Sequence, residues 1–237
     1  MPGVPLGRIL RDRLTGDVNL HAAAQRREYA AVVDAIAADR PASVLDWGCG
    51  YGLISHDLKQ RGLEVVSTDF DPGRPGRRPS SHFPDVEIDY LADPVALPFA
   101  DGEFAAALSL GVLEHVADPG SSLDELHRVL RPGGKLYVYK LPNRFSWLEW
   151  IARRLDLEYH GTRPDDTLYT VRSAVALIER HGFAVESARW ANMLPLTLPG
   201  ALVARLTGPL WWLNRLLARV PGLNRLATNV EVMAIRR

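Results

Sequence analysis

A glycine-rich stretch near the start of the chain carries residue types suited to holding a small charged ligand. Residues 44–52 read Val-Leu-Asp-Trp-Gly-Cys-Gly-Tyr-Gly, so that the carboxylate of Asp46 precedes three glycines at alternate positions. The apolar run before Asp46 predicts a strand, and the apolar residues from Leu53 onward predict a helix. Glycine is needed where the backbone turns with positive φ or approaches a ligand closely. The stretch therefore predicts a ligand-binding turn between a strand and a helix.

The glycine spacing separates this turn from two common phosphate-binding loops. A dinucleotide fingerprint reads G-x-G-x-x-G, and a phosphate loop ends in Gly-Lys followed by Ser or Thr. Here the pattern is Asp-x-Gly-x-Gly-x-Gly, and Leu53 follows the last glycine directly. The carboxylate of Asp46 would repel a polyphosphate but can receive an ammonium group. An NAD-dependent oxidoreductase is therefore poorly supported.

The same residues resemble motif I of the class I S-adenosylmethionine-dependent methyltransferases. In that family the loop holds the methionine end of the cofactor, and S-adenosylhomocysteine is the product. A glycine-rich turn without a ligand is the structural alternative, because short motifs also occur by chance. The resemblance implies that the cofactor is bound by Asp46, Gly48, Cys49, Gly50 and Gly52.

A second carboxylate is expected at the end of the next strand. Residues 63–68 predict this strand, and Asp69 follows them. An acidic residue about twenty positions after the glycine loop can accept hydrogen bonds from the ribose 2′ and 3′ hydroxyl groups. We therefore predict Asp69 as the ribose ligand, with Phe70 beside it at the cofactor.

The resemblance also implies a contact with the adenine ring. In the family, an Asp four residues before a Leu-Pro-Phe sequence commonly contacts the adenine amino group, and Asp93 has this offset from residues 97–99. Pro94 follows, however, and proline lacks the backbone N–H that the family often directs toward the ring. Asp89 is therefore kept as the alternative adenine ligand.

Two further motifs follow in the order that the family shows. Residues 104–110 form a continuous apolar run that predicts a buried strand. The resemblance implies that Leu110, at the end of this strand, contacts the cofactor. Residues 111–116, Gly-Val-Leu-Glu-His-Val, are similar to the family's post-strand motif, and residues 128–136 resemble the turn before its fifth strand. The combined resemblance covers residues 40–142.

Two histidines are suited to removing a proton from a methyl acceptor. His115 lies in the post-strand motif, where it either accepts a proton or orders the loop together with Glu114. His160 lies in the polar loop 158–166, where the chain faintly resembles quinone-biosynthesis O-methyltransferases, which carry a histidine-containing loop over the acceptor. The ordinary pKa of histidine, near 6.5, suits proton removal from a hydroxyl group, but His160 can equally be a surface residue.

Composition limits the class of protein. The chain has 237 residues, 47% of them hydrophobic and 24% charged, which is typical of a soluble globular protein. A formal net charge of zero gives no global attraction to nucleic acid, and no zinc cluster or basic helix is present. The single cysteine, Cys49, indicates a cytoplasmic protein without disulfides or metal. A signal peptide and a membrane-spanning run are not expected.

The expected architecture is an α/β Rossmann-like fold. We predict a seven-stranded, mostly parallel sheet with helices on both faces and one antiparallel C-terminal strand, Val230 to Ile235. Residues 20–237 form a single domain that opens with a helix over residues 20–38. The other expected regions are a flexible leader over residues 1–19, a substrate-side region over residues 143–170 and an apolar helical insert over residues 192–229.

The insert should influence the choice of acceptor. It is rich in Leu and Trp, contains no Asp or Glu, carries several arginines and is divided by Pro199, Pro209 and Pro221 into short amphipathic helices. Such helices can form a cap over an apolar substrate or a dimer contact. Basic, tryptophan-bearing helices also bind anionic membrane interfaces, which would place residues 199–226 peripherally on the inner face of the membrane.

The sequence therefore predicts methyl transfer from S-adenosylmethionine to a small hydrophobic or lipid-like acceptor, most simply at oxygen. The sulfonium group already makes the methyl carbon electrophilic, so that alignment and exclusion of water supply most of the catalysis. Transfer to carbon or nitrogen, or a module that binds the cofactor without transfer, would show the same motifs. The oligomeric state and the acceptor are not predicted.

Overall fold

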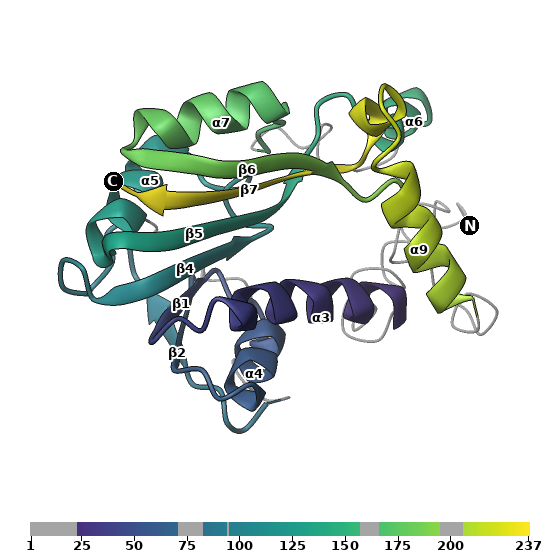
Figure 1. Cartoon of the computed structure of the whole chain (residues 1–237). Helices are drawn as coiled ribbons and strands as arrows, with labels where there is room; N and C mark the ends of the chain where they lie inside the picture. Colours follow the sequence, from purple (N-terminus) through teal and green to yellow (C-terminus); the bar gives the residue numbers. More distant parts are fainter. Residues whose placement is uncertain (1–22, 71–82, 94, 157–165, 195–205) are drawn as a thin grey trace, which may run out of the picture.

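The computed structural model describes residues 23–70, 83–93, 95–156, 166–194 and 206–237. Its centre is a seven-stranded sheet in the order β3-β2-β1-β4-β5-β7-β6 (Figure 1). Neighbouring strands from β3 to β5 are parallel, whereas β7 is antiparallel to both β5 and β6. The predicted fold class is therefore confirmed. The strands are β1 Val44–Trp47, β2 Val65–Phe70, β3 Ile88–Leu91, β4 Phe104–Leu110, β5 Leu130–Pro142, β6 Phe183–Ala191 and β7 Asn229–Arg236.

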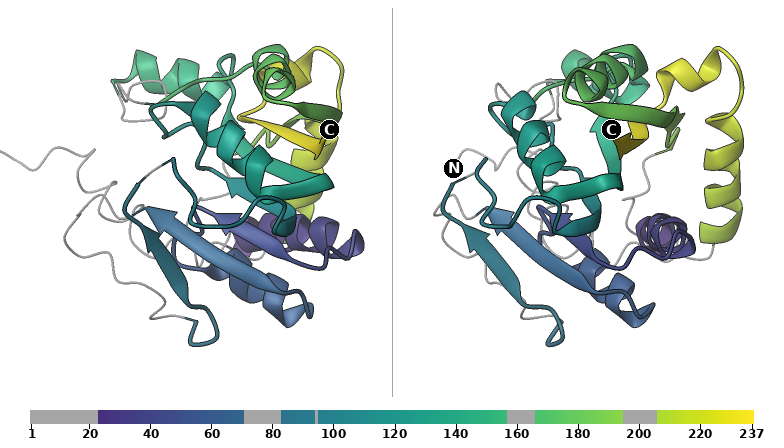
Figure 2. Two further views of the ribbon diagram at one scale, coloured as in Figure 1. Left: turned by 90° about the vertical axis from the view of Figure 1, so that its left-hand side faces the viewer. Right: turned by 60° about the vertical axis from the view of Figure 1, so that its left-hand side comes forward.

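Helices cover both faces of the sheet (Figures 1 and 2). Helices α3 and α4 pack against one face, where Val33, Ile36 and Leu58 are fully buried. Helices α5 and α7 pack against the other face, where Leu126 and Ile178 are fully buried. The central strands are apolar on both sides because each side meets a helix layer. The helices are α3 Ala23–Ala38, α4 Leu53–Gln60, α5 Pro119–Val129, α6 Trp147–Arg154, α7 Val171–Arg180, α9 Thr207–Leu217 and the short 3₁₀ helix η2 Leu223–Leu226.

The predicted beginning of α5 is wrong. The sequence predicts that this helix begins with Ser121 or Ser122 as its N-cap and with Glu125 in a capping box. In the structure Asp118 is the N-cap and accepts hydrogen bonds from the backbone N–H groups of Gly120 and Ser121. Glu125 instead accepts a hydrogen bond from the backbone N–H of Leu97 and pairs with a nearby arginine. Pro119 occupies the first turn, where its missing N–H is harmless.

The carboxyl ends of the parallel strands are flanked by α6, α9 and the beginning of α3 (Figures 1 and 2). Helix α9 packs on α3, where the Trp211 indole donates a hydrogen bond to Glu28 over 3.0 Å and the Arg27 guanidinium stacks on the same indole. The predicted insert is therefore partly helical, although residues 195–205 lie outside the described part, as does the predicted leader. None of the described helices has the length and apolar character that crossing a membrane requires.

Candidate functional site

The glycine turn lies between β1 and α4, as the spacing predicts. Gly48, Gly50 and Gly52 have φ angles of 76°, 61° and 78°, which are unfavourable for other residues. The N–H groups of Gly48 and Cys49 both donate to the Thr68 carbonyl oxygen over 2.9 Å, so that the turn is anchored on the end of β2. The loop therefore stands at the carboxyl edge of the sheet, where open α/β sheets bind ligands.

At two of these glycines, a neighbouring protein side chain occupies the space that a Cβ atom would need. A Cβ atom on Gly48 would lie 2.3 Å from Cγ2 of Val112, and a Cβ atom on Gly52 would lie 2.8 Å from Cγ1 of Val86. Val112 belongs to the loop after β4. Gly48 thus brings the loops after β1 and β4 into close contact, whereas the sequence interpretation explained the glycine only by positive φ or by a nearby ligand.

Asp46 lies beneath the glycine turn. Its side chain is 2% exposed, and its Oδ2 atom accepts a 2.6 Å hydrogen bond from the Ser55 hydroxyl, which in turn accepts one from Ser67. Burial raises the pKa of Asp46 to about 6, the bond from Ser55 opposes that shift, and the charge of Asp69 adds to it. The group is therefore largely ionised at neutral pH and places negative charge under the loop.

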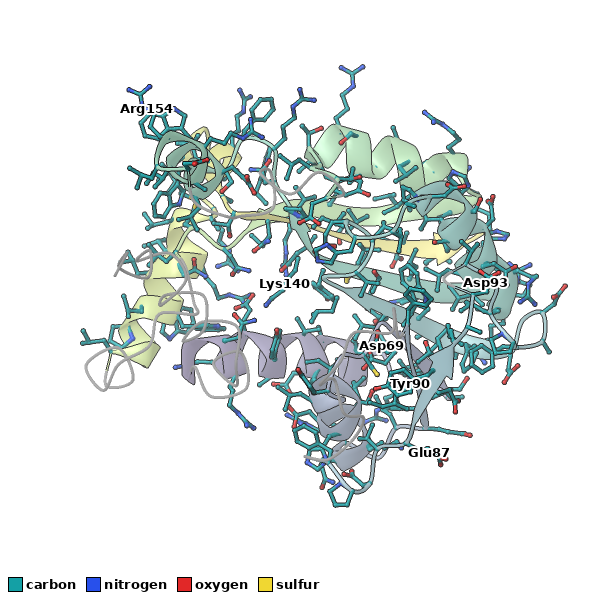
Figure 3. All side chains as sticks on the ribbon, turned by 180° about the vertical axis from the view of Figure 1, so that it is seen from behind. Asp69, Glu87, Tyr90, Asp93, Lys140 and Arg154 are labelled. Atoms are coloured by element: carbon teal, nitrogen blue, oxygen red, sulfur yellow. The ribbon has the colours of Figure 1, made fainter. Side chains whose placement is uncertain are left out.

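Asp69 is the next to last residue of β2 and is 7% exposed. Its Oδ1 atom accepts a 2.7 Å hydrogen bond from the N–H of Phe70, whose own side chain is 37% exposed. Asp69 stands opposite Tyr90 in the β2–β3 register, and both are labelled in Figure 3. Its effect on the pKa of Asp46 shows that the two predicted cofactor carboxylates are near each other.

Asp93 shapes the backbone that follows β3. Its Oδ1 atom accepts hydrogen bonds from the N–H groups of Val95 and Ala96, at 2.8 and 3.0 Å, and these bonds lower its pKa. Its side chain is exposed, as is that of Asp89. Asp93 therefore stays ionised, and its contact with adenine stays a prediction, as does that of Leu110, which is half-buried at the end of β4.

The post-strand loop brings together a histidine and an acid that are distant in sequence. The Nδ1 atom of His115 lies 2.8 Å from Oδ1 of Asp166, and the His115 side chain is 40% exposed. The N–H of Thr167 donates to the carbonyl oxygen of Glu114, which fixes the two segments to each other. The sequence interpretation did not identify Asp166 as a site residue and included it only in the polar loop 158–166. His160 lies outside the described residues.

Glu114 is buried beside this pair. It is 1% exposed, its Oε1 atom lies 3.8 Å from Nε2 of His115, and its Oε2 atom has no hydrogen-bond partner among the described residues. Burial raises the pKa of Glu114 to about 8, and the charge of Asp166 contributes. The group is thus mainly protonated and uncharged at neutral pH.

Lys140 adds a cation that the sequence interpretation did not identify. It lies near the end of β5 with a φ of 63°, and its ammonium group donates to the Tyr29 hydroxyl over 3.0 Å and lies over that ring (Figure 3). Its charge also acts on Glu114, where it lowers the pKa. No periodic pattern could have revealed it, because the contact joins β5 to α3.

These features define a class of protein. A parallel sheet with a left-handed glycine turn after the first strand, a buried carboxylate beneath it and a second carboxylate at the end of β2 matches a nucleoside bearing a cationic amino-acid tail. Asp69 fits the ribose hydroxyl groups, and Asp46 fits the positive charge. The two carboxylates and the glycine turn therefore suit S-adenosylmethionine.

Comparison with known proteins agrees with this class. Residues 45–138 match the family model described as a methyltransferase domain. A demethylmenaquinone methyltransferase of Renibacterium salmoninarum is 35% identical over 205 residues, covering 81% of this chain and 84% of the relative. The chain therefore belongs to the class I S-adenosylmethionine-dependent methyltransferases, and S-adenosylmethionine is its cofactor.

Two further similarities concern the sequence and the fold. A ubiquinone biosynthesis O-methyltransferase of Ruegeria pomeroyi is 32% identical over 161 residues, covering 62% of this chain and 65% of that protein. The solved structure of an S-adenosylmethionine-dependent methyltransferase from Archaeoglobus fulgidus has a TM-score of 0.60 at 16% identity, covering 98% of this chain and all of that chain. The second similarity shows the shared fold.

Proposed function

We propose that this enzyme transfers the methyl group of S-adenosylmethionine to a hydroxyl oxygen on a small apolar acceptor, with His115 as the general base. The observation that carries the proposal is the 2.8 Å contact between Nδ1 of His115, in the loop after β4, and Oδ1 of Asp166, in the segment before α7. A carboxylate on Nδ1 favours the tautomer with its proton on that atom, so that Nε2 is left to accept a proton. A hydroxyl acceptor needs such a base.

The residues around the cofactor would divide the work of binding it. Asp69 holds the ribose hydroxyl groups, with Phe70 beside them, and the glycine turn and the charge of Asp46 hold the amino-acid end. Asp93 is retained as the adenine ligand, with Asp89 as the alternative. When bound, the cofactor supplies an electrophilic methyl group, and the chain's remaining task is to align the acceptor and exclude water.

The acceptor class is inferred from the relatives and from the apolar residues at the carboxyl edge. Two relatives carry names that refer to menaquinone and ubiquinone chemistry. An aromatic or quinone-like acceptor with an apolar tail suits the apolar insert as well. Residues 20–237 would act as one domain in the cytoplasm, with residues 143–170 and 192–229 on the acceptor side.

The test uses labelled S-adenosylmethionine with lipid extracts and with polar metabolite pools. We expect label in the lipid fraction, and we expect His115→Gln to lower the transfer rate about 10²- to 10⁴-fold while cofactor affinity is retained. Asp166→Asn should lower the rate less and should shift the pH profile of transfer, because it acts through His115.

A matched control is His181→Gln, since His181 lies 2.7 Å from Asp124 in an equivalent pair on another part of the surface. This variant should transfer methyl groups at the unaltered rate. An unaltered rate in His115→Gln would eliminate it as the base and leave carbon or nitrogen acceptors, which need less proton removal. Cofactor binding without label in any pool would instead favour a binding module.

A further inference from the structure

Two helices at the carboxyl edge of the sheet expose apolar residues and bury polar ones. In α6, Glu149 is 1% exposed while Trp150 is 64% exposed. In α9, Asn214 is 1% exposed while Trp212 and Leu216 are each 62% exposed. A helix on a protein surface normally does the opposite. Both helices therefore present the face that is expected to contact something else.

Hydrogen bonds fix α9 in this orientation. The Asn214 side-chain oxygen accepts from the N–H groups of Met193 and Leu194 at 2.6 and 2.8 Å, and its amide nitrogen donates to the Asn192 side chain. The buried polar side chain is thus satisfied by the chain that follows β6. These three hydrogen bonds stabilise the orientation in which Trp212 and Leu216 face outward, because rotating α9 to bury these side chains would break all three.

The two helices belong to one continuous surface. The Asn143 side chain, just before α6, donates to the carbonyl oxygens of Arg225 and Ala227 at 2.8 and 2.7 Å, which holds η2 against the start of α6. Figures 1 and 3 show α6, η2 and α9 along the same edge of the molecule. We call this surface the apolar edge; its exposed members are Phe145, Trp150, Leu155, Leu206, Trp212, Leu213, Leu216, Val220, Leu223 and Leu226.

The charges of the apolar edge are nearly all positive. Among the described residues 143–156 and 206–229, the acidic side chains are Glu149, which is buried, and Asp156. The arginines are Arg144, Arg153, Arg154, Arg215, Arg219 and Arg225. Contact with a second copy through this surface would bring like charges together across a two-fold axis. An anionic lipid surface offers the opposite charge and accepts tryptophan and leucine at its interface.

We propose that the apolar edge docks the enzyme on an anionic lipid bilayer, with α6 and α9 lying in the interface. This surface includes α6, whereas the sequence interpretation placed membrane contact only in residues 199–226 and assigned the region of α6 to the substrate side. It flanks the edge of the sheet that carries the cofactor site, so that docking turns this site toward the bilayer. The proposal does not depend on the nature of the acceptor.

The test measures sedimentation of the whole chain with phosphatidylcholine vesicles, with and without phosphatidylglycerol, without cofactor or acceptor. We expect binding to the anionic vesicles only, weakened by salt. Arg153→Glu/Arg154→Glu should lower affinity at least about 25-fold, because each basic residue near an anionic surface contributes about fivefold. Trp212→Ser/Leu216→Ser should lower it at least about tenfold through lost apolar burial.

The matched control is Arg131→Glu/Arg180→Glu. Both arginines are exposed and lie outside the apolar edge: Arg131 is the second residue of β5, and Arg180 is the last residue of α7, just before β6 begins. Its charge change equals that of the Arg153/Arg154 variant, and it should bind vesicles like the unaltered chain. Calorimetry with S-adenosylmethionine establishes that each variant is folded. The proposal would be overturned if the control lost as much vesicle affinity as the Arg153/Arg154 variant, or if the unaltered chain did not bind vesicles. It would also be overturned if the chain formed a dimer in solution that only the Trp212/Leu216 variant abolished.

Discussion

At the scale of single residues, the site holds two buried carboxyl groups in different charge states. Asp46, with a pKa of about 6, is mostly ionised at neutral pH, whereas Glu114, with a pKa of about 8, is mostly protonated. Hydrogen bonds from Ser55 assist ionisation of Asp46, while Glu114 has an Oε2 atom that no described group donates to. The glycine turn therefore offers negative charge to a cation, whereas the acid beside His115 is neutral.

Glu114 should make stability fall as pH rises. Its pKa in the folded chain, about 8, exceeds its ordinary value of 4.5, so that the unfolded chain ionises first. Stability from this group is fully present below pH 4.5 and is lost as pH rises to 8, by roughly 4 kcal/mol. Urea unfolding of Glu114→Gln should show this part of the pH dependence removed. Glu179→Gln, at an exposed position, should keep it; identical slopes in both variants would contradict the assignment.

Asp69 should contribute strongly to cofactor affinity. Asp69→Asn keeps the shape of the side chain but replaces a charged double acceptor, and hydrogen bonds to charged groups are worth roughly tenfold to a hundredfold in affinity. Calorimetry should therefore show S-adenosylmethionine binding weakened by that factor. Glu87→Gln removes a carboxylate from an exposed position before β3 and should bind normally. Unchanged affinity in the Asp69 variant would remove it from the ribose site.

At the scale of elements, the periodicity of the sequence predicted the strands whose position depends mainly on local residues. The apolar run 104–110 became β4 with the predicted bounds, and the C-terminal strand predicted over residues 230–235 became β7, which is one residue longer at each end. The cap of α5 was misassigned because Asp118 and the serines after it are all good capping residues. For Gly48, the positive φ was predictable from the sequence. Its close approach to Val112 was not, because this contact joins two loops that are distant in the sequence.

Gly48 and Gly62 allow the cost of that contact to be separated from the cost of backbone conformation. Both have positive φ, but a Cβ atom on Gly62 would meet nothing within 4 Å. Gly62→Ala should lower the free energy of unfolding by about 1–2 kcal/mol, and Gly48→Ala by a further 1–3 kcal/mol, roughly the cost of overpacking. Denaturant unfolding measures both values. Equal losses would mean that the loop moves away from Val112 freely.

At the scale of the whole molecule, the fold class and the cofactor could be predicted because four sequence motifs resemble those of one family. Composition could not show how charged and apolar residues are distributed over the surface. The chain's net charge of zero did not reveal the cationic apolar edge, because most of the acidic residues lie elsewhere. The His115–Asp166 pair joins residues 51 positions apart in different loops. Such long-range pairings depend on the complete fold and leave no periodic trace.

Cofactor binding should stabilise the molecule as a whole. The site is built from loops after β1, β2 and β4, so that a ligand bridging them is bound only by the folded chain. S-adenosylmethionine at a hundred times its dissociation constant should add about 2.7 kcal/mol to the free energy of unfolding. Thermal scans should show the shift with S-adenosylmethionine and none with NAD. Equal shifts with both would reopen the dinucleotide assignment.

The position of β7 between β5 and β6 constrains the order in which the protein can assemble during synthesis. Strand β6 has β7 as its neighbour in the sheet, yet residues 229–236 are made after the whole insert that follows β6. Until they emerge, β5 and β6 both present open edges of the kind that pair with other chains. A nascent chain that stalls within the insert would therefore be prone to aggregation, and the need for chaperones would be greatest while α9 is being synthesised.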